Sequence, residues 1–394
     1  MNHTTPGQFI QKAVSLSEDA GLDPDANIKL RTDALVDQMR KSGLLAVCVS
    51  KLLGGPELGV RDIAAITYEI AKQSGSAGLI YAMHMSQALS ICNHSRGDWH
   101  KALQQRMVTK QLLFASGTSE VGPEGDILTS ICQVELLDGD RRRVEKSTPN
   151  MSYVDHADFV LVTANYASAK VRSKQVLIAA ELDRNNFIPG RATDLLGMRG
   201  IYNRPYTFVI EFDEQAIFSC DFGVIARETM TPSIQIFWAA VWSGIAWSAL
   251  SKLKRFVIKE ISRDKGLTGP MQHGLTELVS KHYMINSMVR DVIGTYEEAG
   301  DSAGMGFGLS AKLNRVKVKC SELAREICLG ALGIIGIRGY ALSGPYSVAE
   351  EVTDILSGEI MVSNYRLSMN TAKIERFVDE NLFPTVHQVT HGRE

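Results

Sequence analysis

Residues 112–126 (LLFASGTSEVGPEGD) combine residue types that can bind a polar ligand. An apolar stretch that predicts a strand leads into the hydroxyl residues Ser116, Thr118 and Ser119 and then into Glu120. Loop-forming residues follow at Gly122, Pro123, Gly125 and Asp126. A strand that opens into such a loop directs backbone N–H groups and short O–H donors toward a flat polar ring or a phosphate. A simple hairpin turn is the alternative interpretation of these residues.

A second pattern is the run GALGIIGIRGY, in which glycine recurs every three residues at Gly330, Gly333, Gly336 and Gly339. An interior glycine costs a helix about 1 kcal/mol, so the run predicts that its backbone comes very close to something. A neighbouring helix and a ligand such as a pyrophosphate both satisfy that prediction. The glycines within residues 304–308 follow no predicted strand and therefore do not form a dinucleotide-binding fingerprint.

The composition of the 394 residues is that of a soluble globular protein, with 45% hydrophobic and 22% charged residues. The net charge of −2 provides no basic field for nucleic acid or an anionic membrane. The six cysteines form no C-x-x-C pair and have no histidine at zinc spacing, so we expect reduced thiols, no metal site and a cytoplasmic location. The N-terminus lacks the apolar stretch of a secretion signal.

One uncharged segment, Thr231 to Leu250, is long enough to span a bilayer. It contains several polar residues, and its three tryptophans lie in the middle of the segment instead of at two membrane interfaces. We therefore expect a fully buried helix of a soluble bundle and no membrane association.

The chain divides into three regions. Residues 1–110 carry helical periodicity, residues 111–225 contain short β-rich runs separated by turns, and residues 226–394 are helical again. The predicted fold is α+β and mostly α: an N-terminal helical domain, a middle antiparallel β-barrel or sandwich, and a C-terminal four-helix bundle. The last helix of that bundle is expected over about Ser347 to Asn370.

This order of regions resembles the acyl-CoA dehydrogenase family of flavoproteins, and five segments carry the resemblance in the family's order. SGLLAVCVSKLLGGPELG resembles GL-x-x-x-x-x-P-E-x-x-G-G-x-G, and SGTSEVGPEGD resembles T-E-x-x-x-G-S-D. LLGMRGIYN resembles L-G-x-R-x-x-x-S, SRDKGLTGPMQ resembles R-x-x-F-G-x-x-x-x-x-Q, and GIIGIRGY resembles Q-x-x-G-G-x-G-Y.

The resemblance implies FAD bound between the β-domain and the C-terminal bundle, with residues of a partner subunit, and hence a homodimer or homotetramer. Matched by position, the flavin ring would meet Thr118 and Ser119 and a second strand that carries Ser147 and Thr148. The adenosine diphosphate part, bound across the dimer, would meet Arg263, Gln272, Gly336 and Gly339. On the substrate side the resemblance points to Gly125 and His84, and we expect Trp242 of the uncharged helix to line the substrate pocket.

The departures from the family concern the catalytic base. The family's usual glutamate follows an R-D pair by eight residues; here Thr353 and Asp354 occupy the R-D positions and Val362 the base position. Desaturation of an acyl thioester needs a base for the α-proton while the flavin takes the β-hydride. Glu359 lies three residues before Val362 and is the candidate replacement base, with His84 as another.

Three hypotheses follow. The first is a FAD-dependent dehydrogenase of an acyl-CoA or acyl-carrier-protein thioester, with Glu359 as a relocated base and an electron-transfer partner. The second is a flavin-dependent monooxygenase or N-hydroxylase, which uses oxygen and does not need the glutamate. The third is a non-catalytic family member that retains the fold. The tryptophans of the uncharged helix, Trp242 among them, would make a pocket short or suited to a flat substrate, although core packing explains them equally well.

Overall fold

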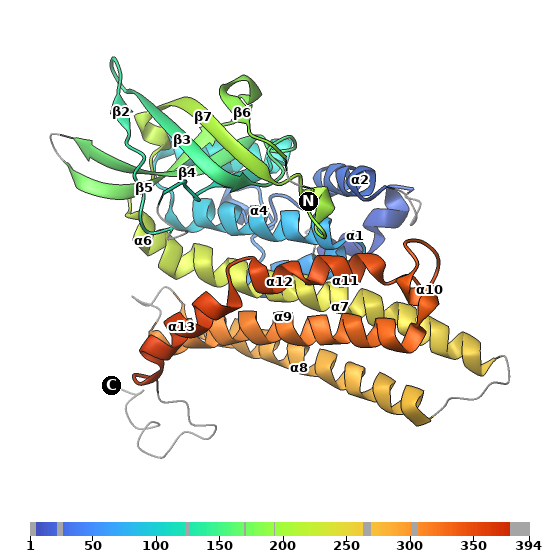
Figure 1. Cartoon of the computed structure of the whole chain (residues 1–394). Coiled ribbons are helices and arrows are strands. Elements are labelled where there is room, and N and C mark those ends of the chain that lie inside the picture. Colours follow the sequence, from blue (N-terminus) through green and yellow to red (C-terminus); the bar gives the residue numbers. More distant parts are fainter. Residues whose placement is uncertain are drawn as a thin grey trace.

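The structure is a computed structural model that describes residues 5–21, 27–122, 127–168, 171–192, 194–262, 269–300 and 306–378. Figure 1 shows a β-domain at the top of the view, N-terminal helices beside and beneath it, and long C-terminal helices below. This arrangement confirms the predicted order of helical, β and helical regions.

The N-terminal helices are α1 (Pro6–Asp19), α2 (Ile28–Lys41), α3 (Val60–Ala71), α4 (Gly75–His94) and α5 (Asp98–Lys110). All five lie within residues 1–110, where helical periodicity predicts a helical domain. Helix α4 is buried over most of its length, which explains why its sequence is small and apolar on every side.

The middle region contains two small sheets. Their strands are β1 (Phe114–Gly117), β2 (Glu135–Leu136), β3 (Arg141–Met151), β4 (Phe159–Ser168), β5 (Val171–Glu181), β6 (Phe187–Pro189) and β7 (Arg204–Asp213). One sheet has the order β1-β4-β5 and the other β2-β3-β7-β6. The prediction of an antiparallel domain was wrong for one pair, because β1 and β4 are parallel. The hairpin of β2 and β3 lies between them in the chain and belongs to the other sheet, so β4 can return in the direction of β1.

Strand β3 was not predicted from its residues, because it begins with three consecutive arginines and such a charged run is not typical of a strand. It lies between β2 and β7 in its sheet. Its side chains are alternately exposed and buried, and the buried ones include Arg142 and Lys146. Arg142 forms an ion pair with Glu214 at 2.6 Å, which allows its guanidinium to lie inside.

The C-terminal region contains three long helices, α7 (Thr231–Ile261), α8 (Gly269–Ala299) and α9 (Phe307–Ile335), entered through the short α6 (Phe222–Ile225). The predicted fourth helix, Ser347 to Asn370, was wrong as a single helix. The chain forms α11 (Ala349–Ile355), α12 (Ser357–Ile360) and α13 (Asn364–Glu375) there, after the short α10 (Ile337–Tyr340). The break between α12 and α13 falls at Val362, whose φ of 52° is left-handed.

The uncharged segment forms part of α7, and the continuous helical stretch Phe222–Ile261 is long and apolar enough to cross a membrane. Of its most apolar 18-residue window, 83% is buried inside the structure. This is the burial expected of a core helix, as predicted from the sequence.

The glycine run ends helix α9. A Cβ at Gly330 would lie 2.6 Å from the side chain of Leu278 on α8, so this glycine permits close helix packing. Gly336 has a φ of 71° and terminates the helix, and Gly339 is buried in α10. The requirement for close packing therefore explains Gly330, and backbone conformation explains Gly336.

Candidate functional site

The segment that follows β1, residues 118–121 (called here the β1 loop), presents unpaired backbone donors. In the described part of the chain the N–H groups of Thr118, Ser119 and Glu120 donate to no backbone carbonyl. The Thr118 hydroxyl lies 3.0 Å from that of Ser116, and Ser119 Oγ donates to the carbonyl of Asn150 at 3.0 Å. The loop therefore holds its hydroxyls in place and leaves consecutive amides for a ligand acceptor.

A buried ion pair anchors this loop to strand β3. Lys146 Nζ lies 3.6 Å from a Glu120 oxygen, and the two side chains are 0% and 7% exposed. The ammonium also donates to the carbonyl and hydroxyl oxygens of Thr163, at 2.8 and 2.9 Å. Burial lowers the pKa of Lys146, and the negative charge of Glu120 opposes that shift. Lysine 146 thus joins the β1 loop, β3 and β4 in one closed cluster.

The two predicted hydroxyl residues of β3 differ in availability. Ser147 is exposed, and its hydroxyl lies 2.9 Å from that of Thr207. Thr148 is buried and donates to the carbonyl of Tyr206 at 3.2 Å. The Ser147 hydroxyl is therefore the one that can reach a ligand, while that of Thr148 is occupied within the sheet.

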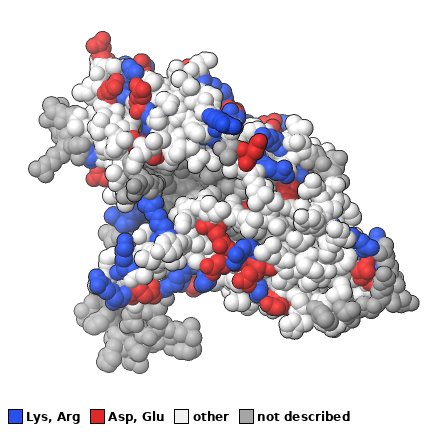
Figure 2. Space-filling view, viewed as in Figure 1, with Lys and Arg blue, Asp and Glu red and all other residues white. Residues whose placement is uncertain are grey.

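Figure 2 shows a hollow in the surface between the β-domain and the C-terminal helices. In Figure 1, α4 lies directly below the β-domain, and α12 and α13 lie further down in the view. Residues 358–364, called here the α12–α13 turn, include Val362, the residue at the position of the family's base. Its side chain is 45% exposed.

The α12–α13 turn is held from inside by Lys317 of α9. The ammonium donates to the carbonyls of Gly358 and Val362 at 2.9 and 2.6 Å, and to Asn364 Oδ1 at 2.7 Å. Burial lowers the pKa of Lys317 to about 8, and Glu359 opposes the shift. This lysine was missed by the sequence interpretation, although its spacing from Leu313 and Cys320 places it on the apolar face of α9.

Helix α7 covers the same cluster from the other side. Trp242 is fully buried, and its ring centroid is 5.4 Å from Lys317 Nζ. A Cβ at Gly358 would lie 3.1 Å from the indole nitrogen of Trp242, so the turn packs directly on the tryptophan. One turn earlier on α9, Asn314 accepts a hydrogen bond from Gln235 at 3.0 Å.

Glu359, the candidate replacement base, forms an ion pair with Arg325. Arg325 Nε lies 2.8 Å from Glu359 Oε1, and the two side chains are 37% and 31% exposed. The ion pair places the Arg325 guanidinium against one of the two oxygens that a base would use. His84 is fully buried; its Nε2 bonds the carbonyl of Leu45 at 2.7 Å, and its Nδ1 accepts from the Phe114 amide at 3.1 Å. Burial lowers the pKa of His84 to about 4, so it is a neutral core residue with both ring nitrogens occupied.

Asp354 is buried where α11 meets the segment of residues 195–200. Its Oδ1 accepts a hydrogen bond from the Met198 amide at 2.6 Å. Burial raises the pKa of Asp354 to about 7, with Glu350 adding to the shift and the Met198 hydrogen bond opposing it. A Cβ at Gly197 would lie 2.1 Å from the carbonyl oxygen of Thr353, so only glycine permits this approach.

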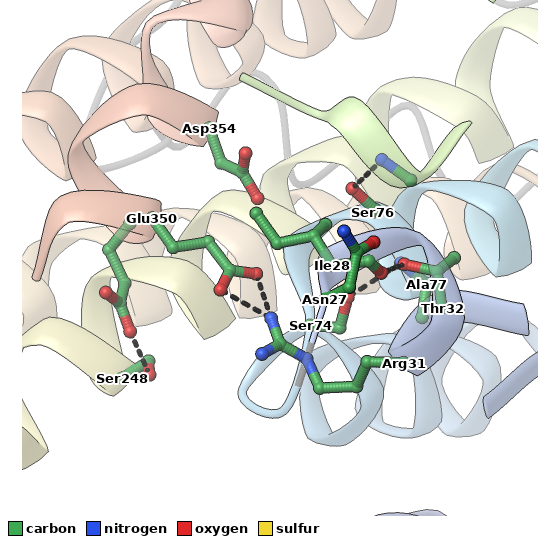
Figure 3. A network of polar contacts seen from close by, with 12 residues as sticks. Asn27, Ile28, Arg31, Thr32, Ser74, Ser76, Ala77, Ser248, Glu350 and Asp354 are labelled. Atoms are coloured by element: carbon green, nitrogen blue, oxygen red, sulfur yellow. Dashed lines mark hydrogen bonds and ion pairs between the residues drawn. The ribbon is translucent and has the colours of Figure 1, made fainter. Parts of the chain in front are cut away.

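Figure 3 shows that Arg31 of α2 reaches Glu350 beside Asp354 and hydrogen-bonds both carboxylate oxygens. The family's R-D arginine is replaced by Thr353, and Arg31 places a guanidinium in the same neighbourhood from another element. A cavity of about 470 Å³ opens here, and its lining includes three cations (Lys29, Arg31 and Arg199) and one carboxylate (Glu350).

The remaining predicted residues lie apart from the β1 loop or outside the described residues. Gly125 and Arg263 are not among the residues that the structure describes. Gln272 is exposed near the start of α8, and Gly336 and Gly339 lie at the end of α9 and in α10. Within one chain the structure therefore places Thr118, Ser119 and Ser147 near one another and leaves the others elsewhere.

A helical domain, two small sheets and a broken helical bundle together define the acyl-CoA dehydrogenase type of fold. Residues 8–110 match the acyl-CoA dehydrogenase N-terminal domain. The FMN-bound structure of TdsC from Paenibacillus sp. A11-2 is similar with a TM-score of 0.81 and 17% identity, covering 96% of this chain and 98% of TdsC. Residues 8–110 thus match a domain of the acyl-CoA dehydrogenase family, and the chain as a whole has the fold of that family.

Two relatives are similar in sequence over most of the chain. The amino sugar nitrososynthase DnmZ of Streptomyces peucetius is 24% identical over 352 residues, which cover 83% of this chain and 82% of DnmZ. The cyclohex-1-ene-1-carbonyl-CoA dehydrogenase of Geobacter metallireducens is 22% identical over 309 residues, which cover 77% of this chain and 80% of that enzyme. The sequence similarity thus extends both to a nitrososynthase and to a dehydrogenase.

Proposed function

We propose that this protein is a flavin-dependent monooxygenase that oxidises a nitrogen or sulfur atom of a small organic substrate. The observation that carries the proposal is Val362 at the position of the family's base. A valine cannot take the α-proton of an acyl thioester, and the carbonyl of Val362 is bonded to Lys317 at 2.6 Å. A heteroatom with a lone pair needs no such base, so the loss of the glutamate is compatible with oxidation at nitrogen or sulfur.

The β1 loop suits the polar edge of a flavin ring. The donors that such an edge accepts are the hydroxyl of the exposed Ser147 and the amides of Thr118, Ser119 and Glu120, which donate to no backbone carbonyl among the described residues. A bound reduced flavin supplies two electrons, with which one atom of dioxygen enters the product and the other leaves as water with two solvent protons. We propose FAD as the cofactor, with FMN as the alternative because TdsC was solved with FMN.

The printed names of several relatives support oxidation at nitrogen or sulfur. DnmZ is an amino sugar nitrososynthase, TdsC a dibenzothiophene monooxygenase and MsuC a methanesulfinate monooxygenase. The solved structures share 15–17% identity with this chain, so they support the fold, and the chemistry is our inference.

We further propose that the protein acts as a homodimer or homotetramer. Gln272, Gly336 and Gly339 lie at the far ends of long helices, where a flavin bound mainly by another copy could reach them. The side chains of Ile337 and Tyr340 beside these glycines are 79% and 70% exposed, as expected of residues that a partner copy covers.

An acyl-CoA or acyl-carrier-protein dehydrogenase is the second candidate function. The 22% identical cyclohex-1-ene-1-carbonyl-CoA dehydrogenase favours it, and Glu359 is the carboxylate nearest in sequence to Val362. If Glu359 is the base, Glu359→Gln should lower acyl-CoA turnover by about 100-fold or more. Glu322→Gln, which also removes a carboxylate from a surface ion pair, is the matched control. Unchanged turnover in Glu359→Gln would exclude a relocated base at this residue.

The proposed function is tested by product analysis. The protein is loaded with FAD or FMN, supplied with a chemical reductant and air, and incubated with separate panels of primary amines, amino sugars and thioethers. We expect mass spectrometry to find at least one product that has gained one oxygen atom and that requires both flavin and protein. Flavin that binds without any oxygenated product would contradict the proposal, and a protein that binds no flavin would support the non-catalytic hypothesis.

A further inference from the structure

Lys317 lies inside the bundle with its side chain 0% exposed. Its three acceptors are the carbonyls of Gly358 and Val362 and the side-chain oxygen of Asn364, at 2.9, 2.6 and 2.7 Å. An ammonium has three N–H donors, so this set satisfies it completely. Among the described residues, no carboxylate lies within 4.0 Å of the Lys317 ammonium, whereas Lys312 and Lys319 on the same helix each have one. A buried charge of this kind persists only where a purpose-built set of oxygens replaces its hydration.

The segment between the first two acceptors is short and strained. Val362 has a φ of 52°, a conformation that a β-branched residue rarely adopts, and its cost is about 1–3 kcal/mol in general. Such a conformation is retained only where the surroundings fix it. The convergence of the carbonyls of Gly358 and Val362 on one ammonium supplies that constraint from either side of the strained bond.

The third acceptor is itself fixed. Asn364 Nδ2 donates to Ser321 Oγ at 3.0 Å, which directs the amide oxygen of Asn364 toward Lys317. Ser321 lies on α9 one turn after Lys317, so one helix face holds the beginning of α13 at two points. Trp242 packs against Gly358 from α7 and completes the enclosure.

We propose that Lys317 is a positioning residue that fixes the α12–α13 turn and thereby sets an apolar wall, Val362, where relatives carry a base. The consequence for the substrate rests on the proposed function. Because Val362 offers no base, the substrate must itself carry a nucleophilic heteroatom, as a sulfide or a neutral amine does. Lysine 317 acts through the backbone of the turn, and its three N–H groups are all engaged there.

The proposal is tested by amide hydrogen exchange on the full-length, FAD-loaded protein, a readout that needs no substrate. Lys317→Met removes the three donors, and we expect exchange in residues 357–366 to rise by about tenfold or more while the middle of α9 stays protected. The matched control is Lys319→Met on the same helix, whose side chain is 62% exposed and pairs with Glu322; it should exchange as the unmodified protein does.

A rescue variant separates positioning from general destabilisation. Glycine adopts positive φ without strain, so Lys317→Met/Val362→Gly should recover much of the protection that Lys317→Met loses in residues 357–366. Lys317→Gln, which keeps two donors, should give an intermediate rise and serves if Lys317→Met does not fold. Unchanged exchange in Lys317→Met, or a rise throughout the bundle that Val362→Gly does not reverse, would overturn the proposal. Hydrogen exchange is measured without turnover. A failed oxygenation assay would therefore refute the proposed function without changing the conclusion about Lys317.

Discussion

The β-domain and the C-terminal bundle each bury one lysine, but they satisfy it in different ways. Lys146 in the β-domain lies 3.6 Å from a carboxylate, Glu120, and donates to two oxygens of Thr163. Lys317 in the bundle has only neutral oxygens as acceptors. The first lysine anchors the β1 loop and the second anchors the α12–α13 turn, so each fixes one segment of the candidate site.

The comparison shows where the chain has kept a family feature and where it has departed from one. The β1 loop retains the carboxylate of the T-E motif, and its lysine forms a charge-neutral pair with it. The α12–α13 turn has a valine in place of the base, and its lysine holds uncharged backbone. The proposed cofactor side thus keeps the carboxylate of the family motif, whereas the proposed substrate side carries a valine where that motif has its base.

Replacing either buried lysine should lower the free energy of unfolding, and the loss should be larger for Lys146 than for Lys317. Lys146→Met leaves the buried carboxylate of Glu120 without a counter-charge, so we expect a loss of about 3–5 kcal/mol in the free energy of unfolding. Lys317→Met leaves only neutral acceptors unpaired, so its loss should be about 1–3 kcal/mol. Urea denaturation measures both.

Two further variants sharpen this prediction. Lys146→Met/Glu120→Gln should recover part of the loss, because it removes the uncompensated charge. Lys174→Met, which breaks a looser pair with Asp221 at 3.8 Å, is the control and should change stability by less than about 1 kcal/mol. Equal losses of stability in Lys146→Met and Lys317→Met would show that the carboxylate partner of Lys146 makes no difference.

The next effect concerns Asp354, whose burial raises its pKa from 3.8 to about 7. Between these values the folded protein binds a proton that the unfolded chain does not, so stability falls as pH rises through that interval. Asp354→Asn keeps an acceptor for the Met198 amide and does not titrate. We therefore expect the variant to gain about 1–3 kcal/mol relative to the unmodified protein between about pH 5 and about pH 8.

Denaturation midpoints at the two pH values measure this difference. Asp138→Asn, at an exposed turn, is the control and should follow the unmodified protein at both. A parallel pH dependence in Asp354→Asn and the unmodified protein would show that Asp354 ionises normally in the folded state.

The smallest expected change in stability concerns Val362, in the strained α12–α13 turn. At most helix and strand positions glycine is about 0.5–1 kcal/mol less stable than alanine. At Val362, with a φ of 52°, the order should reverse, and Val362→Gly should be more stable than Val362→Ala by about 1 kcal/mol. Thermal unfolding of the two variants measures the order, and alanine more stable than glycine would mean that the turn is not left-handed.

Helical periodicity predicted most of the helices and the three-part order, because those elements are set by short-range patterns of apolar residues. Strand β3 was not recognised from its residues, since the burial of Arg142 and Lys146 depends on Glu214 and Glu120, which lie elsewhere in the sequence. The break of the last helix was also missed. It depends on Lys317, which lies 41 and 45 residues from the two carbonyls that it holds.

The β1 loop could be recognised from local sequence as a candidate ligand loop, whereas the lysine behind the α12–α13 turn could not. Hydroxyls and glycines at a strand end, as at Thr118 and Ser119, indicate a ligand loop from local sequence alone. Lys317 stands among other charged residues in KLNRVKVKC and resembles a solvated lysine. Only its spacing from Leu313 and Cys320 indicates an inward position, and spacing does not identify the acceptors.

The loss of dehydrogenase chemistry is tested by mixing the FAD-loaded protein anaerobically with short- and medium-chain saturated acyl-CoA thioesters and recording its visible absorption. With Val362 in place of the base, we predict that the flavin bands do not bleach with any thioester. They should bleach with dithionite and return rapidly when air is admitted. Bleaching by an acyl-CoA would contradict the account, because it would show that the protein abstracts an α-proton with a residue other than Val362.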